Sequence, residues 1–444
     1  MKKFLTLTAS AIILLGLLWS GRYYFQMSTS NSSELFVATD GSDENPGTIG
    51  EPLRTLEAAA DQAVPGTTVS IRGGIYFESL IVQHDGTASD PIVFQAYSDE
   101  KVHLSGEQFE DTPDDRALVE IDGYDHISIK GLTLKNLSTG LPDKTVIGML
   151  VTGHSQYIEL TNNWIENIGT TALEGNAHGI AVYGNVPIQE ITIHKNTLTN
   201  LKLGLSEALV VNGNVSDFSI KENHIYETDN IAIDAIGYEG VADNGNEDYA
   251  RNGVISENTV HNNSSYHNPS YENDYSAGGI YIDGGQDITI ENNTVYQNDI
   301  GIEATSEHKD RSANQIKILN NNVYENTYAG ISIGGYDADR GGTTHSLISG
   351  NTLTDNDTIG LEGGQILFQY YSDSNIIESN DLTASPSGLF ISHEYTGNTD
   401  TIFEDNHYRL GHNTRPRWLW NNREVYSLED FQKLTNSQNE SFVP

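Results

Sequence analysis

A short pattern recurs along the chain and constrains its fold more than any other feature. It has the form apolar-x-apolar-x-x-Asn-x-apolar, as in IELTNNWI (158–165) and ITIENNTV (288–295). Its asparagine falls at positions 163, 196, 223, 258, 293, 321, 351 and 380, which are 27 to 35 residues apart. Isolated strands would not need an asparagine at the same place each time. A stack of coils would, so the repeat predicts a β-solenoid.

A second element precedes each copy of this pattern. It is a short apolar strand such as GIAVYG (179–184) or GGIYIDG (278–284). The first inward apolar residues of these strands align at positions 180, 209, 231, 280, 302, 331, 366 and 389. The smallest step is 22 residues, and the larger steps indicate insertions in the turns. We therefore expect coils of about 22 residues that stack about 4.8 Å apart around a core of Ile, Val and Leu.

The beginning of the chain resembles a known group of proteins. The segment FVATDGSDENPGTIGEPLRTLEAAADQAVPGTTVSIRGGIYFESLIV (36–82) looks like the opening of secreted right-handed parallel β-helix proteins of the pectate-lyase-like superfamily. The resemblance implies an all-β, single-domain right-handed parallel β-helix over residues 35–410. It also implies a short N-terminal capping helix at about Thr55 to Gln62. Residues 411–444 are expected to form a C-terminal cap and tail, with Trp418 and Trp420 packing against the last coil.

This resemblance does not select a reaction. The superfamily includes polysaccharide lyases, glycoside hydrolases, uronan epimerases and adhesins. The calcium and Lys/Arg signatures of the lyases cannot be matched to this chain residue by residue, so no catalytic role is transferred.

The charge balance excludes some classes of partner. The chain has 62 acidic and 23 basic residues and a formal net charge of -39. A nucleic-acid partner is not expected, because phosphate binding needs clustered Lys and Arg. Cysteine is absent, which excludes a disulfide framework, a thiol nucleophile and a thiolate metal site. We expect a monomer.

The N-terminus predicts export. Lys2 and Lys3 precede an apolar run from Phe4 to Trp19, as in a signal peptide or a membrane anchor. Residues 1–25 are therefore predicted to be one or the other, followed by a linker over residues 26–34. Either alternative predicts a secreted or cell-surface protein.

Three carboxylates align on the outward face of the middle coils. In the alignment above, Asp234 and Asp283 share one outward position on adjacent coils, and Glu303 lies diagonally on the next coil. Stacked like charges are destabilising unless a proton, a cation or a substrate compensates them. Carboxylates about 5 Å apart cannot ionise independently, which makes the pair competent as acid plus base or nucleophile. Asp234, Asp283 and Glu303 are therefore the predicted catalytic residues. The stereochemistry stays open, because the distance from Asp234 to Glu303 could be the wider one of inverting enzymes.

Insertions next to these strands predict a cleft. The step between the two Asp strands contains the insertions 237–252 and 261–276, both rich in tyrosine. The opposing interpretation is structural, because Asp before Gly is a common turn residue and His308 fits an ordinary surface loop. The predicted substrate-binding residues are Glu207, Asn212, Tyr238, Glu239, Tyr281, His308, Tyr336 and Arg340.

Three functions follow from these features. The first is an extracellular glycoside hydrolase acting on a polysaccharide or oligosaccharide without a cofactor, because the outward positions carry carboxylates and no Lys or Arg. The second is a polysaccharide lyase or uronan epimerase, in which a loop residue such as His308 or Arg340 would be the base. In that case Asp234, Asp283 and Glu303 would hold Ca²⁺. The third is a non-catalytic carbohydrate-binding protein or adhesin.

Overall fold

The computed structural model describes residues 33–395 and 397–443. The predicted signal peptide or anchor (1–25) and most of the predicted linker lie outside the described residues. Ser33 and Glu34, the last two residues of that linker, already belong to strand β1 (Ser33–Val37), which pairs in parallel with β2 (Thr67–Ile71). None of the helices in the described ranges is long and apolar enough to cross a membrane.

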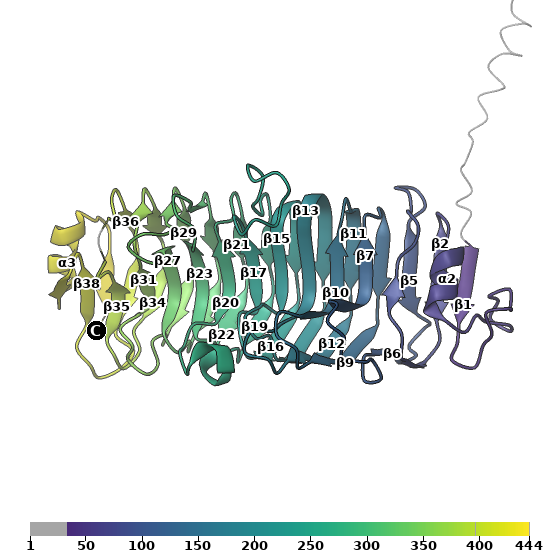
Figure 1. Cartoon of the computed structure of the whole chain (residues 1–444). Coiled ribbons are helices and arrows are strands. Elements are labelled where there is room, and N and C mark those ends of the chain that lie inside the picture. The colour runs from purple at the N-terminus through teal and green to yellow at the C-terminus, as the bar shows by residue number, and fades with distance from the viewer. Residues whose placement is uncertain (1–32, 396, 444) are drawn as a thin grey trace, which may run out of the picture.

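The chain is a parallel β-helix whose strands form three faces along one axis (Figure 1). The site face carries the candidate functional residues. Its strands, in the order of their stacking, are β4 (Leu80–Ile81), β7 (Arg116–Asp122), β10 (Thr145–Thr152), β13 (Asn176–His194), β15 (Leu209–Lys221), β17 (Ile233–Ile236), β20 (Gly278–Asp283), β23 (Ile300–Ser306), β27 (Ala329–Gly335), β31 (Ile366–Phe368), β35 (Leu389–Ser392) and β38 (Arg417–Trp420).

The second face continues from the site face around a corner, which β13 and β15 cross without a break. Its other strands are β1, β2, β5 (Ile92–Ala96), β8 (Ile127–Lys130), β11 (Gln156–Thr161), β18 (Val254–Ser256), β21 (Thr289–Glu291), β25 (Lys317–Leu319), β29 (Leu347–Ser349), β33 (Ile376–Glu378) and β36 (Ile402–Glu404).

The third face is a sheet of 13 strands. They are β3 (Gly74–Tyr76), β6 (Val102–Ser105), β9 (Thr133–Thr139), β12 (Trp164–Thr170), β14 (Thr197–Leu201), β16 (His224–Thr228), β19 (Thr259–His261), β22 (Thr294–Tyr296), β26 (Asn322–Tyr324), β30 (Thr352–Thr354), β34 (Asp381–Thr383), β37 (His407–Arg409) and β40 (Ser441–Val443). Short strands β24 (Ala313–Asn314), β28 (Thr343–Thr344) and β32 (Ser372–Asp373) form a small additional row.

Helices lie near the two ends of the stack (Figure 1). Helix α2 (Leu56–Gln62) occupies the predicted position, and the Thr55 side chain caps it by accepting a hydrogen bond from the Ala58 N–H at 3.1 Å. Its buried Leu56 belongs to the main core. At the other end, β39 (Arg423–Val425) pairs antiparallel with β38. Helix α3 (Leu428–Thr435) packs Phe431 against the rings of Trp418 and Trp420.

The interior is a continuous apolar column. Strands β13, β15, β17, β20 and β23 each contribute a fully buried Ile or Leu at the same register position, namely Ile180, Leu209, Ile233, Ile280 and Ile302. Burial of each such side chain stabilises the fold by about 1.5–3 kcal/mol. The alternate residues of the same strands point outward, so the core fixes which side chains the site face presents.

The recurring asparagines form the ladder that their spacing predicts. Asn258 is typical: its amide donates to the Ile220 carbonyl at 2.9 Å and to Asn293 Oδ1 at 3.0 Å. The Asn258 backbone N–H also donates to Asn293 Oδ1 at 2.9 Å. The ladder continues through Asn380 to Asn406. A second ladder, absent from the sequence prediction, runs through Asn263, Asn298, Asn326 and Asn356.

Two registers in the sequence alignment are wrong. That alignment set Ile231 opposite Leu209 and Ile280, whereas the structure pairs Ile233 with both. Asp234 therefore pairs with Tyr281 and not with Asp283. A shift by two residues leaves the inward and outward alternation unchanged. The segment IAIDA (231–235) therefore fits the core equally well with Ile231 or with Ile233 opposite Leu209. The last strand shows the same error, because Ile391, not Leu389, pairs with Ile366.

Candidate functional site

The three predicted catalytic carboxylates lie in one patch of the site face, but no two of them are direct cross-strand partners. Tyr281 stands between Asp234 and Glu303, because it pairs with Asp234 on β17 and with Glu303 on β23. Asp283 lies two residues beyond Tyr281 and pairs with Thr305. The predicted stacking of Asp234 on Asp283 is thus replaced by a diagonal arrangement.

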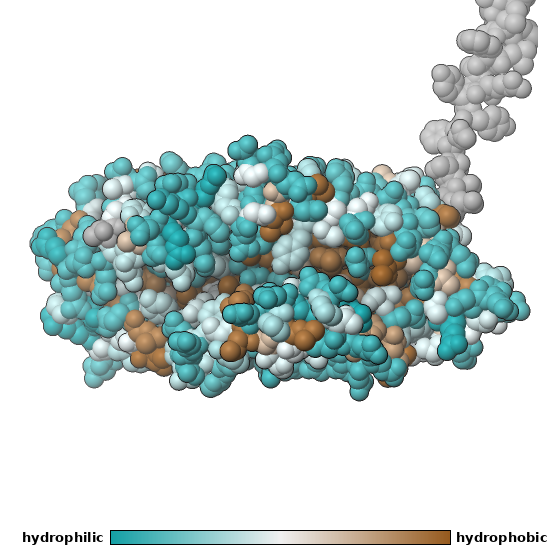
Figure 2. Space-filling view, viewed as in Figure 1, coloured by the Kyte–Doolittle hydropathy of each residue, from teal (hydrophilic) through white to brown (hydrophobic). Residues whose placement is uncertain are grey.

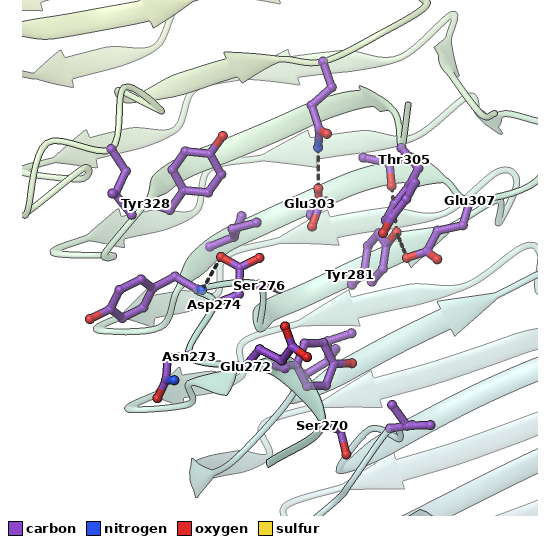
Figure 3. A pocket seen from close by; sticks show the side chains of 18 residues that line it. Ser270, Glu272, Asn273, Asp274, Ser276, Tyr281, Glu303, Thr305, Glu307 and Tyr328 are labelled. Carbon is purple, nitrogen blue, oxygen red and sulfur yellow. Dashed lines mark hydrogen bonds between the residues drawn. The ribbon is translucent and has the colours of Figure 1, made fainter. Parts of the chain in front are cut away.

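A cleft of about 970 Å³ lies over this patch. Its floor includes Tyr281 and Glu303, and one wall is residues 270–276 of the second predicted insertion (Figure 3). That insertion contains the short helices η1 (Ser265–His267) and η2 (Pro269–Tyr271). Figure 2 shows a hollow along this face between more hydrophilic rims. The first predicted insertion, 237–252, contributes no lining residue to the cleft.

Glu303 is the predicted catalytic residue that faces the cleft. Only 7% of it is exposed. Its Oε1 accepts hydrogen bonds from Gln369 Nε2 at 2.7 Å and from Ser332 Oγ at 3.2 Å. Burial raises the pKa of Glu303 to about 8, so this carboxyl group carries a proton at neutral pH. Gln369 belongs to a coil far along the sequence, and only the stacking of the coils brings it to Glu303.

Asp283 is held by the loop that follows β23. Its Oδ1 accepts a hydrogen bond from the Glu307 backbone N–H at 2.8 Å, and its Oδ2 lies 3.6 Å from His308 Nε2. The contact with Asp283 raises the pKa of His308. Glu307 in turn accepts a hydrogen bond from the Tyr281 hydroxyl at 3.2 Å. Glu307 follows directly after the end of β23 and two residues after the outward-facing Thr305. This position in the sequence is the signal that its carboxylate lies beside Tyr281 and Asp283.

A group suited to a metal ion lies at the same place. Glu239, Asp283 and His308 each offer one ligand atom, and these atoms lie within 4.8 Å of one another. Asn212 Nδ2 donates to Glu239 Oε2 at 2.7 Å, which fixes one of these carboxylates. In the described part of the chain, these are the three residues whose ligand atoms lie close enough together to bind one metal ion. The set expected for Ca²⁺, Asp234 with Asp283 and Glu303, does not form such a group among the described residues, and Tyr281 stands between Asp234 and Glu303.

Two further carboxylic acids lie near the cleft without lining it. Asp234 is only 2% exposed, and its Oδ1 has no hydrogen-bond partner. Burial, together with the charge of Glu207, raises the pKa of Asp234 well above its usual range. Burial likewise raises the pKa of Glu207 to about 8, with a further contribution from Glu239. Neither Asp234 nor Glu207 lines the cleft.

His178 and Tyr183 support Glu207 and were not predicted. His178 donates from Nδ1 to the Glu207 carbonyl oxygen at 2.8 Å and accepts the Tyr183 hydroxyl hydrogen bond on Nε2 at 2.8 Å. Burial lowers the pKa of His178 to about 4, so the ring is neutral. Because both ring nitrogens are satisfied within the fold, His178 is a positioning residue.

The other predicted binding residues divide between the cleft and its surroundings. Tyr281 and Tyr336 line the cleft. Tyr238 lies outside it, with the Arg311 guanidinium 4.4 Å from its ring centroid. Arg340 pairs with Asp337 at 2.7 Å and covers the Tyr336 ring at 4.3 Å. The loop guanidinium expected as a base is therefore already engaged with an acid and an aromatic ring.

Comparisons with known proteins agree with this architecture. A family model described as "Pel9A-like, right handed beta helix region" matches residues 35–279. The chain belongs to this family. A second model, "Right handed beta helix region", matches residues 278–413. The Pel9A-like match confirms the resemblance drawn from the N-terminal segment and the right-handed parallel β-helix as the fold class.

Relatives of this Pel9A-like chain differ in what their names record. It is 48% identical to protein YwoF of Bacillus subtilis (strain 168) over 436 residues, covering 97% of this chain and 93% of YwoF. It is 42% identical to pectate lyase PEL9 of Emericella nidulans over 86 residues, covering 19% of this chain and 21% of PEL9. In fold it resembles the GH136 lacto-N-biosidase of Eubacterium ramulus, with a TM-score of 0.57 at 15% identity over 97% of this chain and 70% of that one.

Proposed function

We propose that the protein is a carbohydrate-active enzyme, a glycoside hydrolase with Glu303 as general acid. The observation that supports this most directly is a carboxyl group with a pKa of about 8 on the floor of a tyrosine-lined cleft. Glycoside hydrolysis needs an acid that still holds its proton at the working pH and can deliver it to the leaving oxygen. Glu303 meets both conditions, because burial maintains its proton and the cleft gives it access to a ligand.

Asp283 is the proposed second carboxylate. It lies diagonally from Glu303 across the β20–β23 pair, a relation that separates residues by about 7–8 Å. Inverting glycosidases hold their carboxyl groups about 6.5–9.5 Å apart to leave room for a water molecule. Asp283 also accepts a hydrogen bond from the Glu307 N–H at 2.8 Å and has His308 beside it, and these contacts hold its carboxylate in place. We therefore expect inversion at the anomeric carbon.

The substrate is proposed to be a polysaccharide or oligosaccharide bound outside the cytoplasm. Tyrosine rings suit the apolar faces of sugars, and the hydrolase proposed here needs no cofactor. The GH136 neighbour and the pectate lyase relative, by their names, act on carbohydrates, which supports this class of substrate. Export of the protein, predicted from its N-terminal residues, is part of the proposal.

The test is a panel of polysaccharides assayed for new reducing ends, with and without a chelator. Wild type is compared with Glu303→Gln and Asp283→Asn, and melting curves are recorded for all three. We expect both variants to lose turnover while keeping their melting temperatures. Full activity in Glu303→Gln would contradict the assignment of the general acid.

The second candidate is a polysaccharide lyase or uronan epimerase. It is favoured by the pectate lyase relative and by the Glu239, Asp283 and His308 group, which could hold a cation against a uronate carboxylate. A lyase would give an unsaturated product that absorbs in the ultraviolet, and a chelator would abolish its activity. Reducing ends without that absorbance would exclude the lyase. A non-catalytic adhesin predicts that Asp283→Asn changes only ligand affinity.

A further inference from the structure

The charge of the cleft is one-sided. Two acidic residues lie on the wall, Glu272 and Asp274, and two lie on the floor, Glu303 and Glu307 (Figure 3). Among the described residues that line the cleft, none is Lys, Arg or His. Glu303 is almost fully buried and Glu307 is half-buried, so water screens these two acids less than it screens exposed ones.

More carboxyl groups lie on the same face, beside this lining. Asp234, with its unpartnered Oδ1, pairs with Tyr281 from the next coil, Asp283 follows Tyr281 on β20, and both are almost fully buried. The nearest cationic side chains are engaged elsewhere: Arg340 with Asp337, Arg311 over a tyrosine ring, and His308 beside Asp283. A ligand that brings further negative charge, such as a polyuronate, would be repelled. A ligand that brings positive charge would supply the compensation that stacked acids lack.

The aromatic residues of the cleft favour the same kind of ligand. The lining includes Tyr271, Tyr275, Tyr281, Tyr328 and Tyr336. Tyrosine faces attract an ammonium group through their ring electrons, and carboxylates attract it through charge. Rings alone would be sufficient for a neutral sugar. Rings combined with acids on both sides of the cleft are typical of a site for an amine.

We propose that the cleft binds a saccharide with free amino groups, that is, glucosamine-type units that are cationic at neutral pH. The amines pair with Glu307 on the floor and with Glu272 and Asp274 on the wall, while Glu303 keeps its proton for the leaving oxygen. The claim that such a chain is also cleaved rests on the proposed hydrolase function. The claim that it is bound does not.

The experiment measures binding by titration calorimetry with three probes of equal length: a glucosamine oligosaccharide, its fully N-acetylated counterpart and an oligogalacturonate. We expect the glucosamine oligomer to bind wild type at least tenfold more tightly than the acetylated one, and more weakly as salt is added. The double variant Glu272→Gln, Asp274→Asn should lose at least tenfold in affinity. Glu44→Gln, an exposed acid of an N-terminal loop, is the matched control and should bind as wild type does.

Equal affinity for both oligomers, or tighter binding of the oligogalacturonate, would overturn the inference.

The outcomes also separate this inference from the hydrolase proposal. Selective binding of the glucosamine oligomer without any cleavage would uphold the substrate class and contradict the hydrolase. Cleavage restricted to neutral or acetylated chains would uphold the hydrolase and overturn the substrate class.

Discussion

The asparagine ladder and the acidic cleft are both rows of polar side chains buried on successive coils, yet they differ in how they are satisfied. Asn321 donates from its amide to the Ile290 carbonyl at 2.9 Å and to Asn351 Oδ1 at 3.0 Å, and its own Oδ1 accepts from Asn293. Among the acids, Asp234, which lies beside the cleft, leaves one oxygen without a partner. An amide has both donor and acceptor, so it can repeat indefinitely along a stack. A carboxylate has only acceptors, so a row of acids needs protons or a ligand.

The largest effect should come from the acidic cleft. Glu303→Gln removes the proposed acid while keeping the shape of the side chain, and general acid catalysis typically contributes a factor of about 10² to 10⁴ in rate. We expect turnover to fall by that factor and the melting temperature to stay the same or rise. Steady-state kinetics and thermal melting measure the two effects. A fall in both together would place Glu303 in the same structural role as the asparagines.

For the asparagine ladder we expect a loss of stability and no loss of turnover. Asn321→Ala leaves several buried partners unsatisfied, each worth about 1–3 kcal/mol, so we expect the stability of the neighbouring coils to drop by about 3 kcal/mol. Asn322→Ala is the matched control, because Asn322 is exposed on β26. Hydrogen exchange of the flanking strands measures the loss. Turnover per folded molecule should be unchanged, and a loss of turnover would weaken the division between the two regions.

The pH dependence of stability and activity should follow the titration of Glu207 and Glu303. The pKa values of Glu207 and Glu303 are raised from the ordinary value of 4.5 to about 8 in the folded protein. The folded state therefore holds protons that the unfolded chain releases. This contribution to stability is fully present below about pH 4.5 and is lost as the pH rises through about 8.

Melting temperatures recorded from pH 4 to pH 9 test this dependence, and Glu303→Gln should flatten the curve. Activity should fall above about pH 8, where the general acid ionises. Stability that rises across the same range would show that these carboxyls are ionised in the folded protein.

The smallest effect is expected for Asp234→Asn. Asp234 lies outside the cleft lining, and burial raises the pKa of its carboxyl group and disfavours its charged form, so we expect an amide of the same shape to be tolerated. We expect turnover within about tenfold of wild type, well short of the loss in Glu303→Gln. Parallel kinetics of the two variants provide the comparison. An equal loss would return Asp234 to the catalytic pair predicted from the sequence.

Periodicity carried most of the fold prediction. The Asn spacing and the alternation of apolar residues repeat over many successive coils, so the solenoid follows from several copies of one pattern, and α2 and the first ladder appear where expected. Register was less certain, because IAIDA satisfies the core at two positions that differ by two residues. This single ambiguity moved Asp234 away from Asp283 and placed Tyr281 between Asp234 and Glu303.

The contacts of the site were harder to predict than its location. Gln369 reaches Glu303 across coils separated by 66 residues in the chain, and residues 270–276 fold over the floor as an irregular wall. No period governs such insertions, so the sequence indicates that they lie near the carboxylates but not which side chains enter the cleft. Tyr271 and Tyr275 line it, whereas Tyr238 and Tyr266 do not.

The cleft runs along the stacking axis, from Leu205 before β15 to Gln369 after β31. A saccharide chain lying in it would meet a new coil at each step, so every coil provides its own binding position for one stretch of the polymer. The length of ligand that is gripped is then set by how many coils border the cleft. Removing one whole coil on either side of β20 and β23 would shorten the shortest bound fragment by a fixed increment, while Glu303 and Asp283 keep their mutual geometry.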